Sequence, residues 1–257
     1  MGKSFTKLEQ VKQWDKANLQ ESSFLGLDTR VVLITVLCFV AFVVSVPKYE
    51  IKSLIIYFAF PVFLLTASQH HLWPIAKKIL LVSPFVVLMG VFNPFIDKAP
   101  LMEVFGITIT GGMVSFLVII LKGMLSVSAI VILTSLIPFH KICGAMAALK
   151  VPQAFVVQIL FLYRYIFVLV EEAGSMQRAR DLRSFNGRGK GIQATSRLLG
   201  SLFIRTLDRS QRIYRSMLSR GFTGEIKMTE LRKIGLRDYF FVIVCVSFFL
   251  IVKIKVL

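Results

Sequence analysis

Arginine side chains near the ends of two long segments are the residues of this sequence best suited to specific chemistry. The first segment, residues 151–185, carries Arg180 and Arg183 near its end, and the second, residues 191–222, carries Arg220. A guanidinium group presents a planar fork of N–H donors that binds a carboxylate through two parallel hydrogen bonds. One such arginine can hold and orient a docking partner, so the predicted chemistry is recognition of an acidic surface.

Residue patterns typical of catalysis or of bound cofactors are absent from the sequence. It has no phosphate-binding loop of the GxxxxGKS or GxxxxGKT type, no HExxH and no GxSxG. The three cysteines, Cys38, Cys143 and Cys245, are scattered, and the adjacent His70 and His71 lack a third metal ligand nearby. We therefore expect no enzyme activity, no metal site and no cofactor in this chain.

Both arginine-bearing segments are predicted to be amphipathic helices, because their apolar and polar residues separate at a period of 3.6. The first has a polar stripe through Arg164, Glu171, Ser175 and Arg178 on an otherwise apolar rod. In the second, one side carries Leu199, Leu202, Phe203, Thr206, Ser210, Ile213, Tyr214 and Met217, and the opposite side carries Arg205, Arg209, Arg212 and Ser216.

Turn-forming residues predict where the two helices end. The first should stop within residues 184–187, where Asn186 and Gly187 tolerate a left-handed backbone, and the second at Gly221, a glycine C-cap. An arginine in a last turn also stabilises the helix dipole by roughly 0.3 to 1 kcal/mol, so solvated cations on capped helices are the alternative explanation. The repetition of the pattern some 40 residues apart favours a paired docking surface.

The amino-acid sequence around these two helix ends resembles that of a known family. The three residues at the first end are Ala179, Arg180 and Asp181, and those at the second are Ser219, Arg220 and Gly221, within RSQRIYRSMLSRGFTGE. Together with TSLIPFHKICGAMAALKVP at 134–152 and LYRYIFVLVEEAGSMQRARDLR at 162–183, they resemble the transmembrane T component of energy-coupling factor (ECF) transporters, most closely the CbiQ-type cobalt and nickel subunits. Asp181 stands where that family has glycine, so Arg183 is an alternative first arginine.

The resemblance implies partners and a role. Two cytoplasmic ABC-type ATPase subunits would bind the ATP, one receiving Arg180 or Arg183 and the other Arg220. The apolar helix faces would contact a membrane-embedded substrate-binding subunit, through Leu199, Leu202, Phe203, Ile213 and Met217. The chain would couple ATP hydrolysis to import of cobalt or nickel. A vitamin-specific T component, a channel or a secondary carrier are the alternatives.

Composition predicts an all-α polytopic membrane protein, since 56% of the 257 residues are apolar and the mean hydropathy is +0.73. The net charge of +17 is concentrated: residues 137–237 hold 18 of the 31 lysines and arginines and six of the 14 acids. Basic residues favour the cytoplasmic side of membranes, so this block and the N-terminus are expected inside a bacterial or archaeal cell membrane. No nucleic-acid-binding motif accompanies the charge, so we expect no such partner.

Hydrophobic runs predict about five transmembrane helices plus a cytoplasmic coupling domain of long amphipathic helices. We expect a cytoplasmic N-terminal segment (1–30), four spans within 31–137, coupling helices at 138–235 and a last span within 236–257. The expected spans are 31–46, 51–68, 79–92, 107–138 and 236–252, with an external loop at 97–106. Residues 151–170 are not expected to span, because a fifth span there would place the basic block outside. Lys122, inside the fourth span, is interpreted as pointing into the bundle or toward the interface.

Overall fold

The computed structural model describes residues 27–68, 72–96, 100–104, 107–184, 191–224 and 234–255. The contacts divide the described residues into two units, which are treated separately below. One is a helical bundle of residues 21–145 and 231–257, and the other contains residues 146–230. The expected surface helix of the N-terminal segment and the residues His70 and His71 lie outside the described residues.

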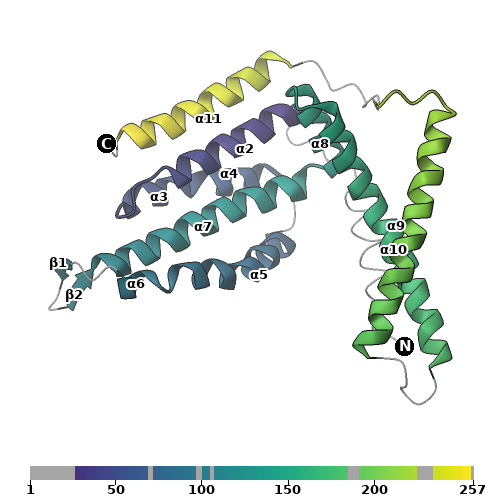
Figure 1. Cartoon of the computed structure of the whole chain (residues 1–257). Coiled ribbons are helices and arrows are strands. Elements are labelled where there is room, and N and C mark those ends of the chain that lie inside the picture. Colours follow the sequence, from purple (N-terminus) through teal and green to yellow (C-terminus); the bar gives the residue numbers. More distant parts are fainter. Residues whose placement is uncertain are drawn as a thin grey trace. The chain divides into compact units, whose positions relative to one another are not determined.

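The bundle is built around one long apolar helix (Figure 1). This helix, α7 (Gly111–Leu136), contacts α2 (Thr29–Val44), α3 (Ile51–Tyr57), α4 (Ala59–Ser68), α5 (Leu72–Gly90) and the short α6 (Asn93–Ile96). The last helix, α11 (Leu236–Ile254), packs on α2 and α3, and α8 (Phe139–Ala148) follows α7 after Pro138. A glycine allows the closest contact: a Cβ at Gly123 of α7 would lie 2.4 Å from Val86 of α5.

Aromatic side chains form the centre of this bundle. Phe39 of α2, Tyr57 of α3 and Phe249 of α11 are fully buried, and the ring centroids of Phe39 and Phe60 lie 4.6 Å apart. The Tyr57 hydroxyl donates a hydrogen bond of 3.0 Å to the carbonyl oxygen of Phe249. A buried phenol needs such a hydrogen-bond partner. The bond also joins α3 to α11, through two residues that are 192 positions apart in the sequence.

The second predicted span is a broken helix. It divides at Phe58 into α3 and α4. Pro61 explains the break, because it has no N–H to donate to the carbonyl of Tyr57 and its ring crowds the preceding turn.

A buried carboxylate joins the beginnings of α2 and α11. Asp238 accepts hydrogen bonds from the backbone N–H of Asp28 (3.0 Å) and of Gly235 (2.8 Å). Asp28 in turn caps α2 by accepting from the N–H of Arg30 at 2.9 Å. Both carboxylates are almost fully buried, and the bond between residues 28 and 238 spans 210 positions of the sequence. The pair therefore fixes the last helix against the first described one.

Lys122 has its partners inside the bundle, as the packing interpretation predicted. Its Nζ donates to the carbonyl oxygens of Val44, at 3.2 Å, and of Val46. These carbonyls lie at the end of α2, where the last turn of a helix leaves its C=O groups without intrahelical donors. Lys253 of α11 reaches the same end and donates to the Ser45 hydroxyl at 3.0 Å. Lys122 thus caps α2, and Lys253 contacts the side chain of the residue that follows it.

Two boundaries differ from the predictions. The loop expected at 97–106 contains a strand, β1 (Pro100–Val104), which pairs antiparallel with β2 (Ile107–Thr110), so the fourth helix begins at Gly111 and not at residue 107. Residues 107–110 are β-branched at every position, ITIT, which favours a strand over a helix. The third helix begins at Leu72, not residue 79, so Lys77 and Lys78 lie within it, and Lys78 donates to Ser135 at 3.1 Å.

Three helices of the described residues are long and apolar enough to cross a membrane: 73–90, Gly111–Leu136 and Gln153–Arg183. The helix Thr29–Val44 and the apolar stretch 51–67 are shorter. The helix α11 combines its apolar residues with Arg237, Asp238 and Lys253. The all-α membrane fold is thereby confirmed, with one small β-hairpin added.

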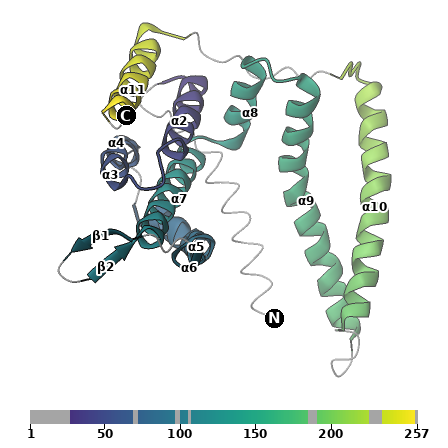
Figure 2. The ribbon, with the colours of Figure 1, turned by 60° about the vertical axis from the view of Figure 1, so that its left-hand side comes forward.

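The second unit contains a pair of long helices, α9 (Gln153–Arg183) and α10 (Ile192–Leu218). They lie close together where α9 ends and α10 begins, and further apart at the opposite ends (Figure 2). In the part of the chain that the structure describes, α9 buries only Val156 and Val157, and α10 buries no residue. This α9–α10 hairpin is therefore held by few contacts within its own chain.

Replacing Asp238 by alanine tests the carboxylate that joins α2 and α11. Asp238→Ala leaves one buried and one part-buried backbone donor without an acceptor, so we expect a loss of about 2 kcal/mol in the free energy of unfolding. Thermal unfolding in mild detergent measures it. The control Lys255→Ala, at the exposed end of α11, should stay within about 0.5 kcal/mol of the parent protein. Equal effects of the two substitutions would contradict this assignment.

Candidate docking site

The end of α10 is closed by Gly221, as predicted. The N–H of Phe222 donates to the carbonyl of Met217 at 3.0 Å, and the N–H of Gly221 donates to that of Leu218 at 3.0 Å. This is the hydrogen-bond pattern of a Schellman motif, and it requires the left-handed backbone that Gly221 adopts, with φ of +80°. No other atom approaches within 4 Å of a Cβ placed there, so backbone conformation alone demands glycine.

Arg220 lies in this last turn with Ser219, immediately before Gly221. Its side chain is exposed, and it forms no ion pair among the described residues. The capped turn holds the backbone of Arg220 in one conformation. Its guanidinium has no ion-pair partner among the described residues, so its donors are available to another protein. These are the properties a docking arginine needs.

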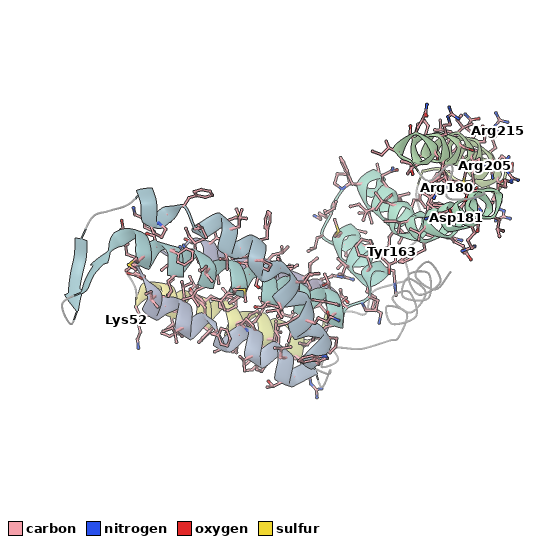
Figure 3. The ribbon with its side chains drawn as sticks, turned by 90° about the horizontal axis from the view of Figure 1, so that it is seen from below. Lys52, Tyr163, Arg180, Asp181, Arg205 and Arg215 are labelled. Atoms are coloured by element: carbon pink, nitrogen blue, oxygen red, sulfur yellow. The ribbon has the colours of Figure 1, made fainter. Side chains whose placement is uncertain are left out.

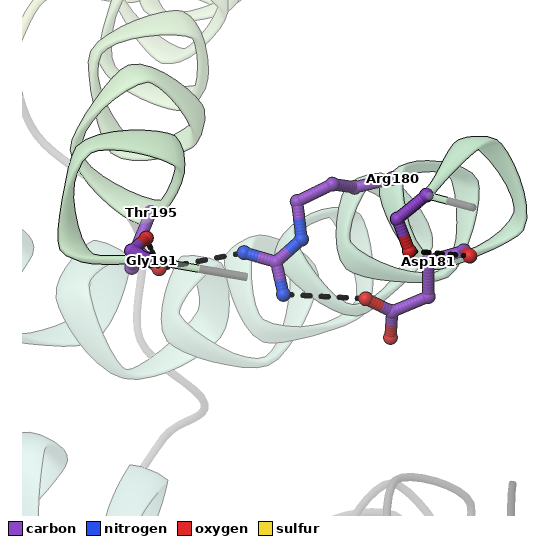
Figure 4. A network of polar contacts seen from close by, with 5 residues as sticks. Arg180, Asp181, Gly191 and Thr195 are labelled. Carbon is purple, nitrogen blue, oxygen red and sulfur yellow. Dashed lines mark hydrogen bonds and ion pairs between the residues drawn. The ribbon is translucent and has the colours of Figure 1, made fainter. Parts of the chain in front are cut away.

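The end of α9 has a different structure. The helix ends at Arg183, one residue before the predicted range of 184–187, and Asn186 and Gly187 lie outside the described residues. Ser184 is extended, and its hydroxyl donates to the carbonyl of Asp181 at 2.9 Å. Arg180 is only 22% exposed and is held on two sides (Figure 4). Its Nη2 lies 3.3 Å from a carboxylate oxygen of Asp181, and its Nη1 donates to Thr195 of α10 at 3.4 Å. Arg180 thus joins the two helices of the hairpin.

Arg183 is the freer of the two candidate arginines at this end. It is exposed, and no hydrogen bond or ion pair of its side chain is found in the described part of the chain. Asp181, where the resembling family has glycine, partly neutralises Arg180. The geometry therefore favours Arg183 as the side chain that can reach a partner, and Arg180 as a residue that closes the hairpin. Ala179, the remaining residue of the predicted first end, is exposed beside them.

The two arginine-bearing ends lie at opposite ends of the hairpin. Arg180 contacts Thr195 near the beginning of α10, whereas Arg220 follows its last turn. At 1.5 Å per residue, the 25 residues from 195 to 220 correspond to roughly 37 Å. Such a separation suits two distinct partner surfaces and excludes a single shared site.

The residues predicted to contact a substrate-binding subunit fall into two groups. Leu199 and Phe203 are exposed, by 57% and 63%, and Leu202 is half-buried beside them. Ile213 and Met217 instead line the space between α9 and α10. Further apolar side chains of α10 that we did not include are also exposed: Ile204, Leu207, Tyr214 and Leu218. Their spacing of three and four residues in the sequence was the available signal for Leu207, Tyr214 and Leu218.

One ion pair across the hairpin was not predicted. Arg209 of α10 lies 2.9 Å from the Glu172 carboxylate of α9, although we had placed Arg209 only on a polar stripe. Such an exposed pair contributes about 0 to 1 kcal/mol, so it orients the helices more than it stabilises them. Figure 3 shows the basic side chains that this unit carries.

The described residues form no cluster suited to metal binding and no reactive thiol at Cys143. No three His, Cys, Asp or Glu side chains gather there to hold a metal ion. Burial raises the pKa of the Cys143 thiol, which keeps it in the unreactive protonated form at neutral pH. What the described part of the chain offers is a surface for binding.

The fold and this surface define a polytopic helical membrane protein with a helical hairpin whose two ends carry arginine. Of its two helices, α10 is amphipathic, whereas the predicted polar and apolar faces of α9 are only weakly separated. The family model named CbiQ, described as cobalt transport protein, matches residues 20–231, and the chain belongs to this family. It is thus a membrane-embedded component of the cobalt-transport type.

Individual relatives agree with the family match. An uncharacterized protein of Methanocaldococcus jannaschii is 27% identical over 85% of this chain and 77% of its own length. Cobalt transport protein CbiQ of Rhodobacter capsulatus is 30% identical over 32% of this chain and 34% of its own. CbiQ of Salmonella typhimurium is 26% identical over 42% of this chain and 48% of its own. The chain thus matches less than half the length of these two cobalt transport proteins.

Two glycine-to-alanine substitutions in one helix should have opposite effects. Gly221→Ala forces an alanine into a left-handed backbone, which costs about 1 kcal/mol and opens the last turn of α10. Gly200→Ala replaces a helical glycine with open space around it and should stabilise the helix by up to about 1 kcal/mol. Hydrogen–deuterium exchange of residues 205–222 should become roughly fivefold faster in the first variant and no faster in the second. The same response in both would rule out a special role for Gly221.

Proposed function

We propose that this chain is the energy-coupling transmembrane subunit of an ECF-type ABC importer for cobalt or nickel. In this role it transmits the ATP-driven motion of two cytoplasmic ATPase subunits to a membrane-embedded substrate-binding subunit. The proposal extends the family membership and the sequence resemblance. ATP would be bound by the partner subunits, because this sequence lacks a phosphate-binding loop.

The observation that carries the proposal is the exposure of α10. This helix of 27 residues buries none of them, although one of its faces is apolar and another is rich in arginine. An apolar surface of this kind is unfavourable in water, so it calls for a cover by lipid or by another subunit. In the proposed assembly, Leu199, Leu202 and Phe203 contact the substrate-binding subunit.

The two ends of the hairpin supply the proposed contacts with the ATPases. Arg220 docks on one ATPase subunit, and Arg183, with Arg180 behind it, docks on the other. A pair of identical or similar ATPases presents two equivalent acidic surfaces, and two separated arginine-bearing ends match that arrangement. Helices suit the task because a helix transmits displacement along its length, whereas a loop absorbs it.

ATP-driven closure of the ATPases would move the Arg220 end of α10 relative to the beginning of α9, and so change the angle between α9 and α10. The few contacts that join the helices, such as Arg209 with Glu172, permit such a change. The moving apolar faces would then reorient the substrate-binding subunit and release its cargo inward. Cobalt as the cargo is supported by the names of the relatives from Rhodobacter capsulatus and Salmonella typhimurium.

The proposed orientation places the hairpin on the cytoplasmic side. The helix α9 is apolar and long enough to span a bilayer by composition. Against a spanning role stand Arg164, which is exposed within its apolar half, and the basic residues that follow it. We propose that α9 lies at the membrane interface, with its apolar side toward lipid and partner.

Arg220→Ala tests docking at the end of α10. Removal of a charge-assisted, bidentate hydrogen bond should weaken the retention of the ATPase subunits roughly 10- to 100-fold. Co-purification in mild detergent and ATP-dependent Co²⁺ uptake in liposomes measure the two consequences. Arg215→Ala is the control, since Arg215 is an exposed arginine of the same helix. Unchanged ATPase retention in Arg220→Ala would refute docking at this end.

The two candidate arginines of α9 should behave differently. Arg183→Ala should lower ATPase retention with little effect on the hairpin. Arg180→Ala should loosen the contact with Thr195 and increase hydrogen–deuterium exchange at the beginning of α10. A loss of retention in Arg180→Ala without any change in exchange would reverse the assignment.

A further inference from the structure

The hairpin contains an arginine-lined cleft that extends from Arg220, a proposed docking residue, along α10 and α9. Along α10, four arginines at 205, 209, 212 and 220 face this cleft at helical spacing, and Arg164 of α9 joins them. The cleft has a volume of about 1200 Å³. Its lining holds five arginines against two acids, Glu172 and Asp208.

Most of this positive charge is uncompensated within the described part of the chain. Arg209 pairs with Glu172 at 2.9 Å, but no ion pair joins Arg205, Arg212 or Arg220 to an acidic side chain there. Arg164 lies near the ring of Tyr165, 6.0 Å from its centroid. Like charges gathered along one cleft repel each other unless an anion binds between them.

An apolar cleft adjoins the arginine-lined one. Its volume is about 580 Å³, within the roughly 300 to 1,000 Å³ typical of small-molecule sites. Phe161, Tyr165, Ile213 and Met217 line both clefts. Val168 and Leu169 of α9 face Leu207 and Tyr214 of α10 in the apolar one. A charged compartment and an apolar compartment therefore share a wall.

We propose that the α9–α10 hairpin binds one anionic phospholipid. Its phosphate is held by Arg164, Arg205 and Arg212, and part of an acyl chain lies in the apolar cleft. Guanidinium groups bind phosphate oxygens bidentately, and the adjoining apolar walls suit hydrocarbon. A free phosphate would leave the apolar cleft empty, and a purely apolar ligand would leave the arginines unpaired. The charge complementarity and the adjacent compartments together favour an amphiphile.

The bound lipid would bridge the two helices where few protein contacts join them. It would thereby set the angle between α9 and α10. This role differs from the diffuse attraction of basic residues to an anionic membrane, which amounts to about a fivefold change in affinity per charge and needs no cavity. Its residues differ from those of ATPase docking, because Arg164, Arg205 and Arg212 are not proposed docking residues, although Arg220 lines the same cleft.

Native mass spectrometry of the purified full chain in detergent tests the proposal, with phosphatidylglycerol, phosphatidylcholine and inorganic phosphate added separately. We expect one retained phosphatidylglycerol per chain, and at least about tenfold weaker retention in Arg212→Gln and Arg164→Gln. Arg215→Gln removes the same charge from the same helix outside the cleft and should change retention less than twofold (Figure 3). Val168→Trp keeps every charge but fills the apolar cleft, and it should also weaken retention.

Several outcomes would overturn the proposal. Equal retention of phosphatidylcholine would remove the role of the charge, and an equal loss in Arg215→Gln would indicate diffuse adsorption. Full competition by inorganic phosphate, with no effect of Val168→Trp, would indicate a simple anion site. No retained lipid would favour an acidic protein segment as the occupant. Because none of these variants alters a proposed docking residue, ATPase retention measured on the same proteins separates a failure here from a failure of the proposed function.

Discussion

The rest of this structure depends on one constraint: the amphipathic helix α10 does not bury its apolar face against the described part of its own chain. The helix α10 exposes an apolar face with Leu199, Phe203 and Tyr214 and a basic face with Arg205 and Arg212, and no described residue of it is buried. The ion pair between Arg209 and Glu172 and the contact of Arg180 with Thr195 are weak contacts between α9 and α10. Stability of this element must come from lipid and from partners, and that dependence makes it responsive to them.

The bundle has the opposite character. Its helices are tied by long-range contacts through buried groups: Asp238 to the backbone of Asp28, Tyr57 to the carbonyl of Phe249, and Lys122 to the end of α2. Each satisfies a polar group that would otherwise be unpaired in an apolar environment. A bundle joined by buried polar contacts and a hairpin with few contacts between its helices are the two parts that the proposed coupling role requires.

Local signals in the sequence predicted most of the helices and the ends of the hairpin. Gly221 was recognisable because only a glycine readily adopts its backbone conformation, and the long helix that ends before Pro138 was clear from its apolar run. The strand at 107–110 was missed, because hydropathy does not distinguish an apolar strand from the beginning of a span. The partners of Asp238, Lys122 and Arg180 were also missed. They depend on contacts between distant positions, and a single sequence carries no local trace of these.

The distance between the beginning of α9 and the end of α10 tests the central claim most directly, because these two ends lie apart at the open side of the hairpin (Figure 2). Spin labels at positions 155 and 219, in a chain with its three cysteines replaced, would report that distance by pulsed electron paramagnetic resonance in the assembled complex. The account predicts a shorter distance after ATP binds to the ATPase subunits than in their nucleotide-free state. Identical distance distributions in the two states, in a complex that still imports Co²⁺, would contradict it.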